Sequence, residues 1–221
     1  MIVIYCLKKN LQRHTMKYTV EDLNDTSLFQ KRLELRYDEI ASFVMENLRQ
    51  MTLLKKAFFG LCIILLFVYG FFLGKCIANI KWYTLTLYTI LGFIVLPFVV
   101  IAVHEIIHII PLLFLGIKNI RASFELQQFM VLVTTHKKVM SDKYYYFVAI
   151  LPFVIINTVI IILMFLTPLI WQYALSALLF VHTTCCIGDI TLIASCKKLG
   201  RDIYTWDDFD QRISYFYQKI N

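Results

Sequence analysis

Three side chains that can do hydrolytic chemistry together stand within five residues of a long apolar run. His104, Glu105 and His108 have the spacing His-Glu-x-x-His. On a helix the two histidines lie on one face, one turn apart, and at this spacing both can hold one metal ion. The carboxylate between them can act on a water molecule at the metal without binding the metal itself. The motif therefore predicts metal-assisted hydrolysis.

The composition indicates a membrane protein. Of the 221 residues, 59% are hydrophobic, and the mean hydropathy is +0.68, too apolar for a soluble domain. The net charge of +7 comes from basic residues that flank apolar runs. Such charge is typical of cytoplasmic loops and argues against a nucleic-acid partner. The six cysteines form no Cys-x-x-Cys pair, so we predict packing thiols and no disulfide framework.

Four apolar segments are long enough to cross a bilayer: 57–74, 83–115, 144–166 and 169–196. Pro97 and Pro111 interrupt the second segment, so we expect it to bend or partly unwind. The predicted fold is mainly α: a polytopic membrane protein with about four transmembrane helices, a small cytoplasmic helix and a short β-hairpin.

Three regions follow from this pattern. Residues 1–56 are predicted to be a cytoplasmic segment with an amphipathic helix from about Ser27, and Met16 is an alternative start. Residues 57–196 are predicted to be a four-span membrane metallopeptidase domain, with the hairpin in the loop at 121–135. Residues 197–221 alternate aromatic and charged side chains and are predicted to be a cytoplasmic or interfacial tail.

Positive charge predicts the orientation. The N-terminal segment carries ten Lys and Arg residues, the loop 116–143 five, and residues 197–221 five. The two opposite connections carry two and none. Both termini and the middle loop are therefore expected on the cytoplasmic side.

Five ionisable side chains of the acidic or histidine type lie inside the apolar segments: His104, Glu105, His108, His182 and Asp189. Ionisable groups are costly at membrane depth and by default mark function. By helix rise, His108 lies about 10 Å and Asp189 about 12 Å from the same membrane face. A catalytic zinc takes three protein ligands, and we predict His104, His108 and Asp189. Glu105 is the predicted general base.

Two residues of the last segment compete with Asp189. His182 lies seven residues earlier on the same face, about 10.5 Å away along the axis, so both can bind one ion only if the helix breaks. Cys185 lies between them and offers a thiolate. His182 and Cys185 therefore stay open as alternative third ligands, although for His182 we rather expect contact with a metal ligand or a packing role. Asn157 is predicted to make a hydrogen bond between helices.

With His104-Glu105-Ile106-Ile107-His108 in one segment and Gly188-Asp189 in the last, the chain resembles a bacterial family of small membrane proteins called putative zincin peptidases. It is also distantly similar to the site-2 proteases, although their Asn-Pro…Asp-Gly motif is absent. The resemblance covers roughly residues 55–200. It implies peptidase activity and a place in the bacterial cell membrane. The ligand types favour Zn²⁺ as the cofactor, with Fe, Co and Mn as alternatives.

We predict a membrane-embedded zinc metallopeptidase that hydrolyses peptide bonds of a membrane or membrane-proximal protein. Its partners would be that peptide substrate and the lipid bilayer; cleavage within and beside the membrane both fit. The hairpin at 121–135 is expected to offer a strand edge to an extended substrate. The alternative is a non-catalytic membrane scaffold or regulator with a structural metal site. A metal transporter or haem protein is a third hypothesis.

Overall fold

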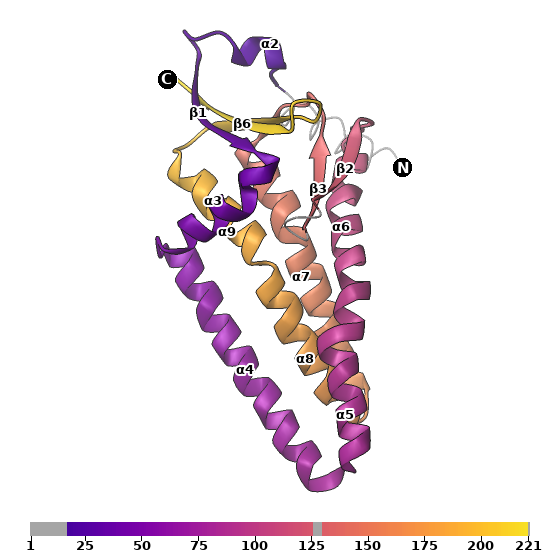
Figure 1. The fold of residues 1–221 in the computed structure, drawn as a ribbon. Coiled ribbons are helices and arrows are strands. Elements are labelled where there is room, and N and C mark those ends of the chain that lie inside the picture. Colours follow the sequence, from indigo (N-terminus) through magenta and orange to yellow (C-terminus); the bar gives the residue numbers. More distant parts are fainter. Residues whose placement is uncertain (1–16, 126–129, 221) are drawn as a thin grey trace, which may run out of the picture. The chain divides into compact units, whose positions relative to one another are not determined.

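The computed structural model describes residues 17–125 and 130–220; the alternative start at Met16 lies outside them. The described residues are mainly helical, with a small antiparallel sheet (Figure 1). The chain divides into two compact units. The sheet unit comprises residues 1–50, 107–149 and 191–221, and the helical unit comprises residues 51–106 and 150–190.

Four helical segments of the described chain are long and apolar enough to cross a membrane, which confirms the predicted fold class. The first is α4 (Leu53–Asn79) and the third is α7 (Asp142–Leu166). The second runs through α5 (Trp82–Ile90), η2 (Leu91–Val95) and α6 (Leu96–Phe114). The fourth consists of α8 (Leu169–Cys185) and α9 (Ile187–Lys198).

The second span stays helical from residue 82 to residue 114, so the predicted unwinding is wrong. Its irregularity is the π-helical turn η2, which ends two residues before Pro97. Proline lacks an N–H, and its ring crowds the carbonyl four residues earlier. The wider π turn accommodates both effects without ending the helix.

Gly92 brings this π turn directly against α8 inside the helical unit. A Cβ at residue 92 would lie 2.6 Å from the carbonyl oxygen of Ala174 and 2.9 Å from the Cβ of Ala177. Real Cβ atoms do not approach a carbonyl oxygen this closely. The π turn and α8 therefore pack nearly backbone to backbone, and only glycine fits the contact.

The fourth span is two helices joined at Cys186, where the sequence predicted one. The Cys186 N–H donates to the carbonyls of His182 (3.2 Å) and Thr183 (3.1 Å), which ends α8. The Cys186 thiol also donates to the His182 carbonyl, at 3.2 Å. This break is the condition under which His182 and Asp189 can approach one partner.

The sheet unit contains a four-stranded antiparallel sheet in the order β1-β6-β5-β4. Its strands are β1 (Phe29–Arg36), β4 (Met140–Ser141), β5 (Ile203–Asp208) and β6 (Ile213–Lys219). The N-terminal segment, the middle loop and the tail thus meet in one sheet. Since strands pair only on one side of a membrane, these three segments share a side.

Two expectations about this unit need correction. The helix predicted from about Ser27 is wrong over residues 29–36, which form β1; the short η1 (Tyr37–Glu39) and α3 (Ile40–Leu48) follow. The tail, for which no strand was predicted, forms β5 and β6. The buried side chains of Leu35, Ile203 and Phe216 pack in one cluster, which ties β1 to the tail.

The predicted hairpin is present as β2 (Ile120–Glu125) and β3 (Met130–Thr135), paired from Ile120 with Thr135 to Glu125 with Met130. Its turn, residues 126–129, lies outside the described residues. A further short helix, α2 (Val20–Leu23), has a capping box in which Thr19 and Asp22 bond each other's backbone.

Candidate metal centre

Helix α6 carries the whole His-Glu-x-x-His motif. His104 and His108 stand four residues apart on it, so one turn separates their rings, and Glu105 follows His104 directly. Each of the three is half-buried. The helical geometry that the motif requires is therefore present.

The structure brings Asp189 to His104. Asp189, in the first turn of α9, places Oδ2 3.2 Å from His104 Nε2. The side chain of His104 is 12% exposed and that of Asp189 is 24% exposed. Of the three candidate third ligands, Asp189 is the one whose carboxylate faces the ring nitrogen that the motif would use for a metal.

The tautomer of His108 follows from a backbone carbonyl. His108 Nδ1 lies 3.0 Å from the oxygen of Val148 in α7. A carbonyl only accepts, so Nδ1 carries the proton and donates. In the neutral imidazole the lone pair is then on Nε2.

His104 reaches the same tautomer through a chain of side chains in the helical unit. Its Nδ1 lies 3.2 Å from His182 Nε2, and His182 Nδ1 lies 2.7 Å from Asn157 Oδ1. An amide oxygen only accepts, so His182 donates from Nδ1 and, when neutral, accepts at Nε2. His104 therefore donates from Nδ1 and turns the Nε2 lone pair toward Asp189.

These partners fit a metal centre. Histidines that bind metals almost always donate their other ring N–H to an oxygen or a similar acceptor, which fixes the tautomer. His104 and His108 both do so, through unrelated partners. The lone pair of His104 Nε2 also faces a carboxylate oxygen of Asp189, and a cation between two such acceptors satisfies both.

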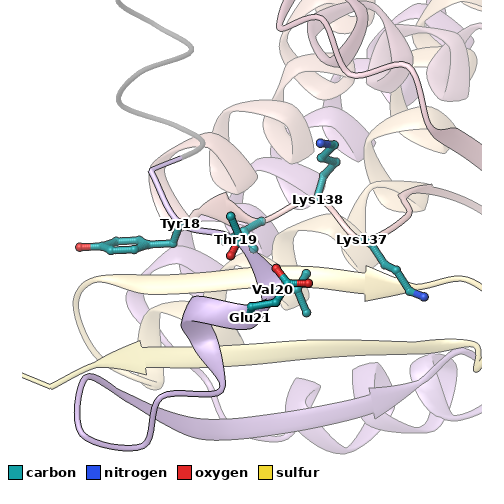
Figure 2. A pocket seen from close by; sticks show the side chains of 7 residues that line it. Tyr18, Thr19, Val20, Glu21, Lys137 and Lys138 are labelled. Atoms are coloured by element: carbon teal, nitrogen blue, oxygen red, sulfur yellow. The ribbon is translucent and has the colours of Figure 1, made fainter.

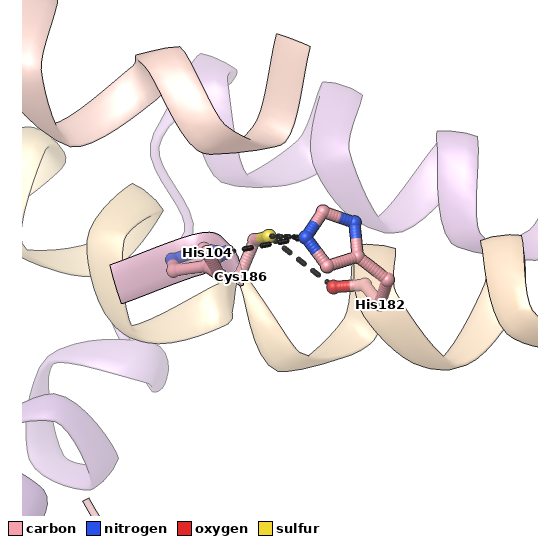
Figure 3. Close-up of side chains that lie close together, drawn as sticks. All are labelled: His104, His182 and Cys186. Atoms are coloured by element: carbon pink, nitrogen blue, oxygen red, sulfur yellow. Dashed lines mark hydrogen bonds between the residues drawn. The ribbon is translucent and has the colours of Figure 1, made fainter. Parts of the chain in front are cut away.

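A second group, His104, His182 and Cys186, has its ligand atoms within 4.8 Å of one another (Figure 3). Both ring nitrogens of His182 are engaged, with His104 and Asn157, and the Cys186 thiol donates to a carbonyl. We therefore assign this group to hydrogen bonding. Cys185, the thiol considered from the sequence, is exposed, whereas Cys186 is buried.

A third group lies in the sheet unit, where His136, Asp208 and Asp210 also have ligand atoms within 4.8 Å. His136 Nδ1 accepts from the backbone N–H of Phe209 at 3.1 Å. Asp208 Oδ1 accepts from the backbone N–H groups of Asp210 (3.0 Å) and Gln211 (3.2 Å). These contacts are those of a turn between strands β5 and β6.

A hollow in the sheet unit is lined by residues 18–21 and 137–139. Figure 2 shows that the side chains of Tyr18, Lys137 and Lys138 diverge from one another. Groups that diverge cannot act on one small molecule together, so we assign no chemistry to this hollow.

Sequence reasoning missed the chain that orients His104. It gave Asn157 a helix–helix hydrogen bond, and the bond to Thr183 in α8 is of that kind. What it missed is that Asn157 also holds His182, which in turn holds His104. The available signal was three polar side chains, Asn157, His182 and Thr183, in apolar segments that need none for packing.

The comparisons with known proteins agree with the chemistry of this site. No curated protein and no solved structure matches the chain. Residues 97–204, which include the motif on α6 together with α7, α8 and α9, match the model of a family described as "Putative zincin peptidase". The resemblance to this family that the sequence predicted is thereby confirmed over residues 97–204.

Proposed function

We propose that this protein is a membrane-embedded zinc peptidase that hydrolyses peptide bonds of membrane or membrane-proximal proteins. The observation that carries the proposal is that Nδ1 of each motif histidine faces a hydrogen-bond partner, which assigns both rings the same tautomer. Two independent acceptors, Val148 O and His182 Nε2, leave Nε2 of each ring as the lone-pair nitrogen. Packing alone does not require that both rings have the same polarity.

His104, His108 and Asp189 would hold the zinc ion, a donor set of two imidazoles and one carboxylate that zinc accepts in catalytic sites. Bound zinc supplies Lewis acidity, which makes water nucleophilic at neutral pH and polarises a carbonyl. Val148 O and the His182–Asn157 pair keep the two imidazoles in the ligating tautomer.

Glu105 moves the protons in this proposal. Its carboxylate takes a proton from the attacking water as the water oxygen bonds to the scissile carbonyl carbon. When the C–N bond breaks, Glu105 returns that proton to the leaving amine. Water and one peptide bond thus give a carboxylic acid and an amine; the acid then loses its proton to the amine or to solvent, and Glu105 ends in its starting state.

The substrate would be held as an extended strand, because a helix hides its peptide bonds in its own hydrogen bonds. Pairing along the β2–β3 hairpin offers such a strand backbone hydrogen bonds. Ala122→Pro removes an N–H within β2 and should raise KM for a peptide substrate while the zinc content stays unchanged. Loss of zinc in this variant would instead show that the hairpin supports the metal centre.

In the proposed topology both termini lie in the cytoplasm. The sheet supports one part of it, since β1, β4, β5 and β6 must share one side; the positive charge of the sequence is the reason to place that side in the cytoplasm. In a variant without its native thiols, a cysteine at Lys219 should react with a membrane-impermeant reagent only after the cells are opened. A cysteine at Asn79, between the first two spans, should react in intact cells. The reverse pattern would invert the topology.

The test of function compares new peptide N-termini in membranes that contain the wild type or Glu105→Gln. Glu105→Gln should retain zinc and lose the cleavage products, because the amide cannot accept the proton. Glu46→Gln, an exposed position on α3, is the matched control and should cleave normally. A cellular function that survives Glu105→Gln unchanged would favour the non-catalytic scaffold.

A further inference from the structure

We propose that Asn157 and His182 are positioning residues that fix the tautomer and the orientation of His104 for metal binding. The inference rests on the proposed function, in which His104 is a zinc ligand. It adds two residues, from helices α7 and α8, that touch neither the metal nor the substrate. Each acts on the site through the next side chain in a chain of hydrogen bonds.

The series of hydrogen bonds starts at Thr183. Asn157 Nδ2 donates to Thr183 Oγ1 at 2.9 Å, and in this orientation Oδ1 faces His182. Asn157 is 8% exposed and Thr183 is fully buried. Because both side chains are buried, the amide is held between Thr183 and His182.

The amide orientation is passed on through both rings. Asn157 Oδ1 accepts from His182 Nδ1 at 2.7 Å, so His182 Nε2 accepts from His104 Nδ1 at 3.2 Å. The His104 proton is thereby held on Nδ1, and the lone pair is held on Nε2. The rings of His104 and His182 meet edge to face, with centroids 5.4 Å apart, which also restrains the plane of His104.

A second polar chain in the helical unit shows what a purely structural network looks like. Tyr69 bonds Tyr173 at 3.1 Å, Tyr173 bonds Thr89 at 2.7 Å, and Thr89 donates to a backbone carbonyl of its own helix. That chain ends in a satisfied backbone group. The hydrogen bonds of Asn157 and His182 lead instead to a histidine of the motif. Burying polar groups costs free energy, so two apolar side chains at positions 157 and 182 would serve packing better.

The experiment measures zinc affinity of the purified protein in detergent by competition with a chelating dye. His182→Leu and Asn157→Leu should each weaken zinc binding by about 10- to 100-fold, the usual effect of losing an outer partner of a metal ligand. His182→Gln should bind more tightly than His182→Leu, because the glutamine amide oxygen can still accept from His104 Nδ1.

Tyr173→Phe is the matched control. It removes a buried hydroxyl from the same helix, nine residues or about 13.5 Å from His182, and should leave zinc affinity unchanged. Thermal unfolding of each variant shows whether it is folded. The visible spectrum of the Co²⁺-loaded protein supplies a second readout, since a rotated His104 changes the ligand field and a packing defect elsewhere does not.

If a leucine variant fails to fold, ¹⁵N NMR of the histidine-labelled, zinc-loaded wild type decides the question alone. The expected result is a proton on Nδ1 of both His104 and His182. A proton on His182 Nε2, or wild-type zinc affinity and Co²⁺ spectrum in folded His182→Leu, would overturn the proposal. Failure of the zinc site itself is distinguishable, because the wild type would then bind no more zinc than His104→Ala.

Discussion

Among the residues that the structure describes, two places bring histidine and aspartate side chains close enough to hold a metal ion, and one of these two has the polarity of a metal site. In the helical unit His104 Nε2 faces Asp189 at 3.2 Å. In the sheet unit His136 Nε2 faces Asp210 at 3.6 Å. Residue types and separations are nearly the same, so proximity does not separate the two.

The opposite nitrogen of each ring does separate them. His136 Nδ1 accepts from the Phe209 N–H, so Nε2 carries the proton and donates toward Asp210, which needs no cation. His104 Nδ1 donates to His182, so Nε2 presents a lone pair to a carboxylate. The hydrogen bond that Nδ1 makes thus decides whether the contact at Nε2 belongs to a turn or to a metal centre.

Removal of the metal should have the largest effect, because it should abolish the activity that we assign to the His104 site and leave the His136 turn intact. A zinc chelator is expected to lower turnover of the wild type to background, and added Zn²⁺ should restore it, because the reaction needs the Lewis acid. His136→Ala should respond identically, whereas His104→Ala should not recover. Turnover that persists in metal-free protein, measured by peptide cleavage, would contradict the assignment.

Asp208→Ala should affect stability and not metal. The substitution leaves the backbone N–H groups of Asp210 and Gln211 without their acceptor, which costs about 1–3 kcal/mol. We expect a lower unfolding midpoint and unchanged zinc content. A zinc content that falls with Asp208 in folded protein would mean that the sheet unit holds a metal as well.

Gly92→Val tests whether a packing defect in the helical unit leaves the hydrogen bonds from Asn157 through His182 to His104 intact. Its side chain would collide with the Ala174 carbonyl and the Ala177 methyl, so we expect a loss of about 1–3 kcal/mol in unfolding free energy. Because His182 lies further along α8, zinc affinity of the folded fraction should stay within about twofold of wild type. Calorimetry and chelator competition read the two effects separately.

The smallest expected effect is a pH dependence in the sheet unit. Burial raises the pKa of Asp207, although hydrogen bonds from Ser214 and the Thr135 N–H oppose the shift. The folded state then holds the proton more tightly than the unfolded state. The unfolding free energy should therefore fall as pH rises from the ordinary carboxyl pKa through the folded pKa, and level off above it.

Asp207→Asn removes this titration, so its stability relative to the wild type should increase with pH across the same window. Unfolding midpoints of the two proteins, measured in parallel from acid to neutral pH, give the difference directly. A difference that is constant with pH, or that falls as pH rises, would refute the direction of the shift.

What the sequence could predict depended on whether the cause is local. Apolar runs of 18 or more residues are sufficient to identify the spans, and His-Glu-x-x-His is sufficient to nominate a metal site. Helix rise also matched the depth of Asp189 to that of the motif, since both quantities depend on counting residues along a helix.

The parts that could not be predicted depend on partners far away in the chain. β1 pairs with β6, from Phe29 with Lys219 to Arg36 with Ile213, and no local pattern specifies that partner. The tail did alternate aromatic and charged residues with a period of two, which is the pattern of a strand; it was interpreted as an interfacial segment. No proline marks the break at Cys186, and Gly188, two residues later, lies inside α9.

Metal analysis of four purified proteins tests the central claim most directly: the wild type, His104→Ala, Asp189→Asn and His136→Ala. We predict about one zinc per chain in the wild type and in His136→Ala, and close to none in His104→Ala and Asp189→Asn. Equal zinc in all four proteins would contradict the account, as would loss of zinc from His136→Ala alone.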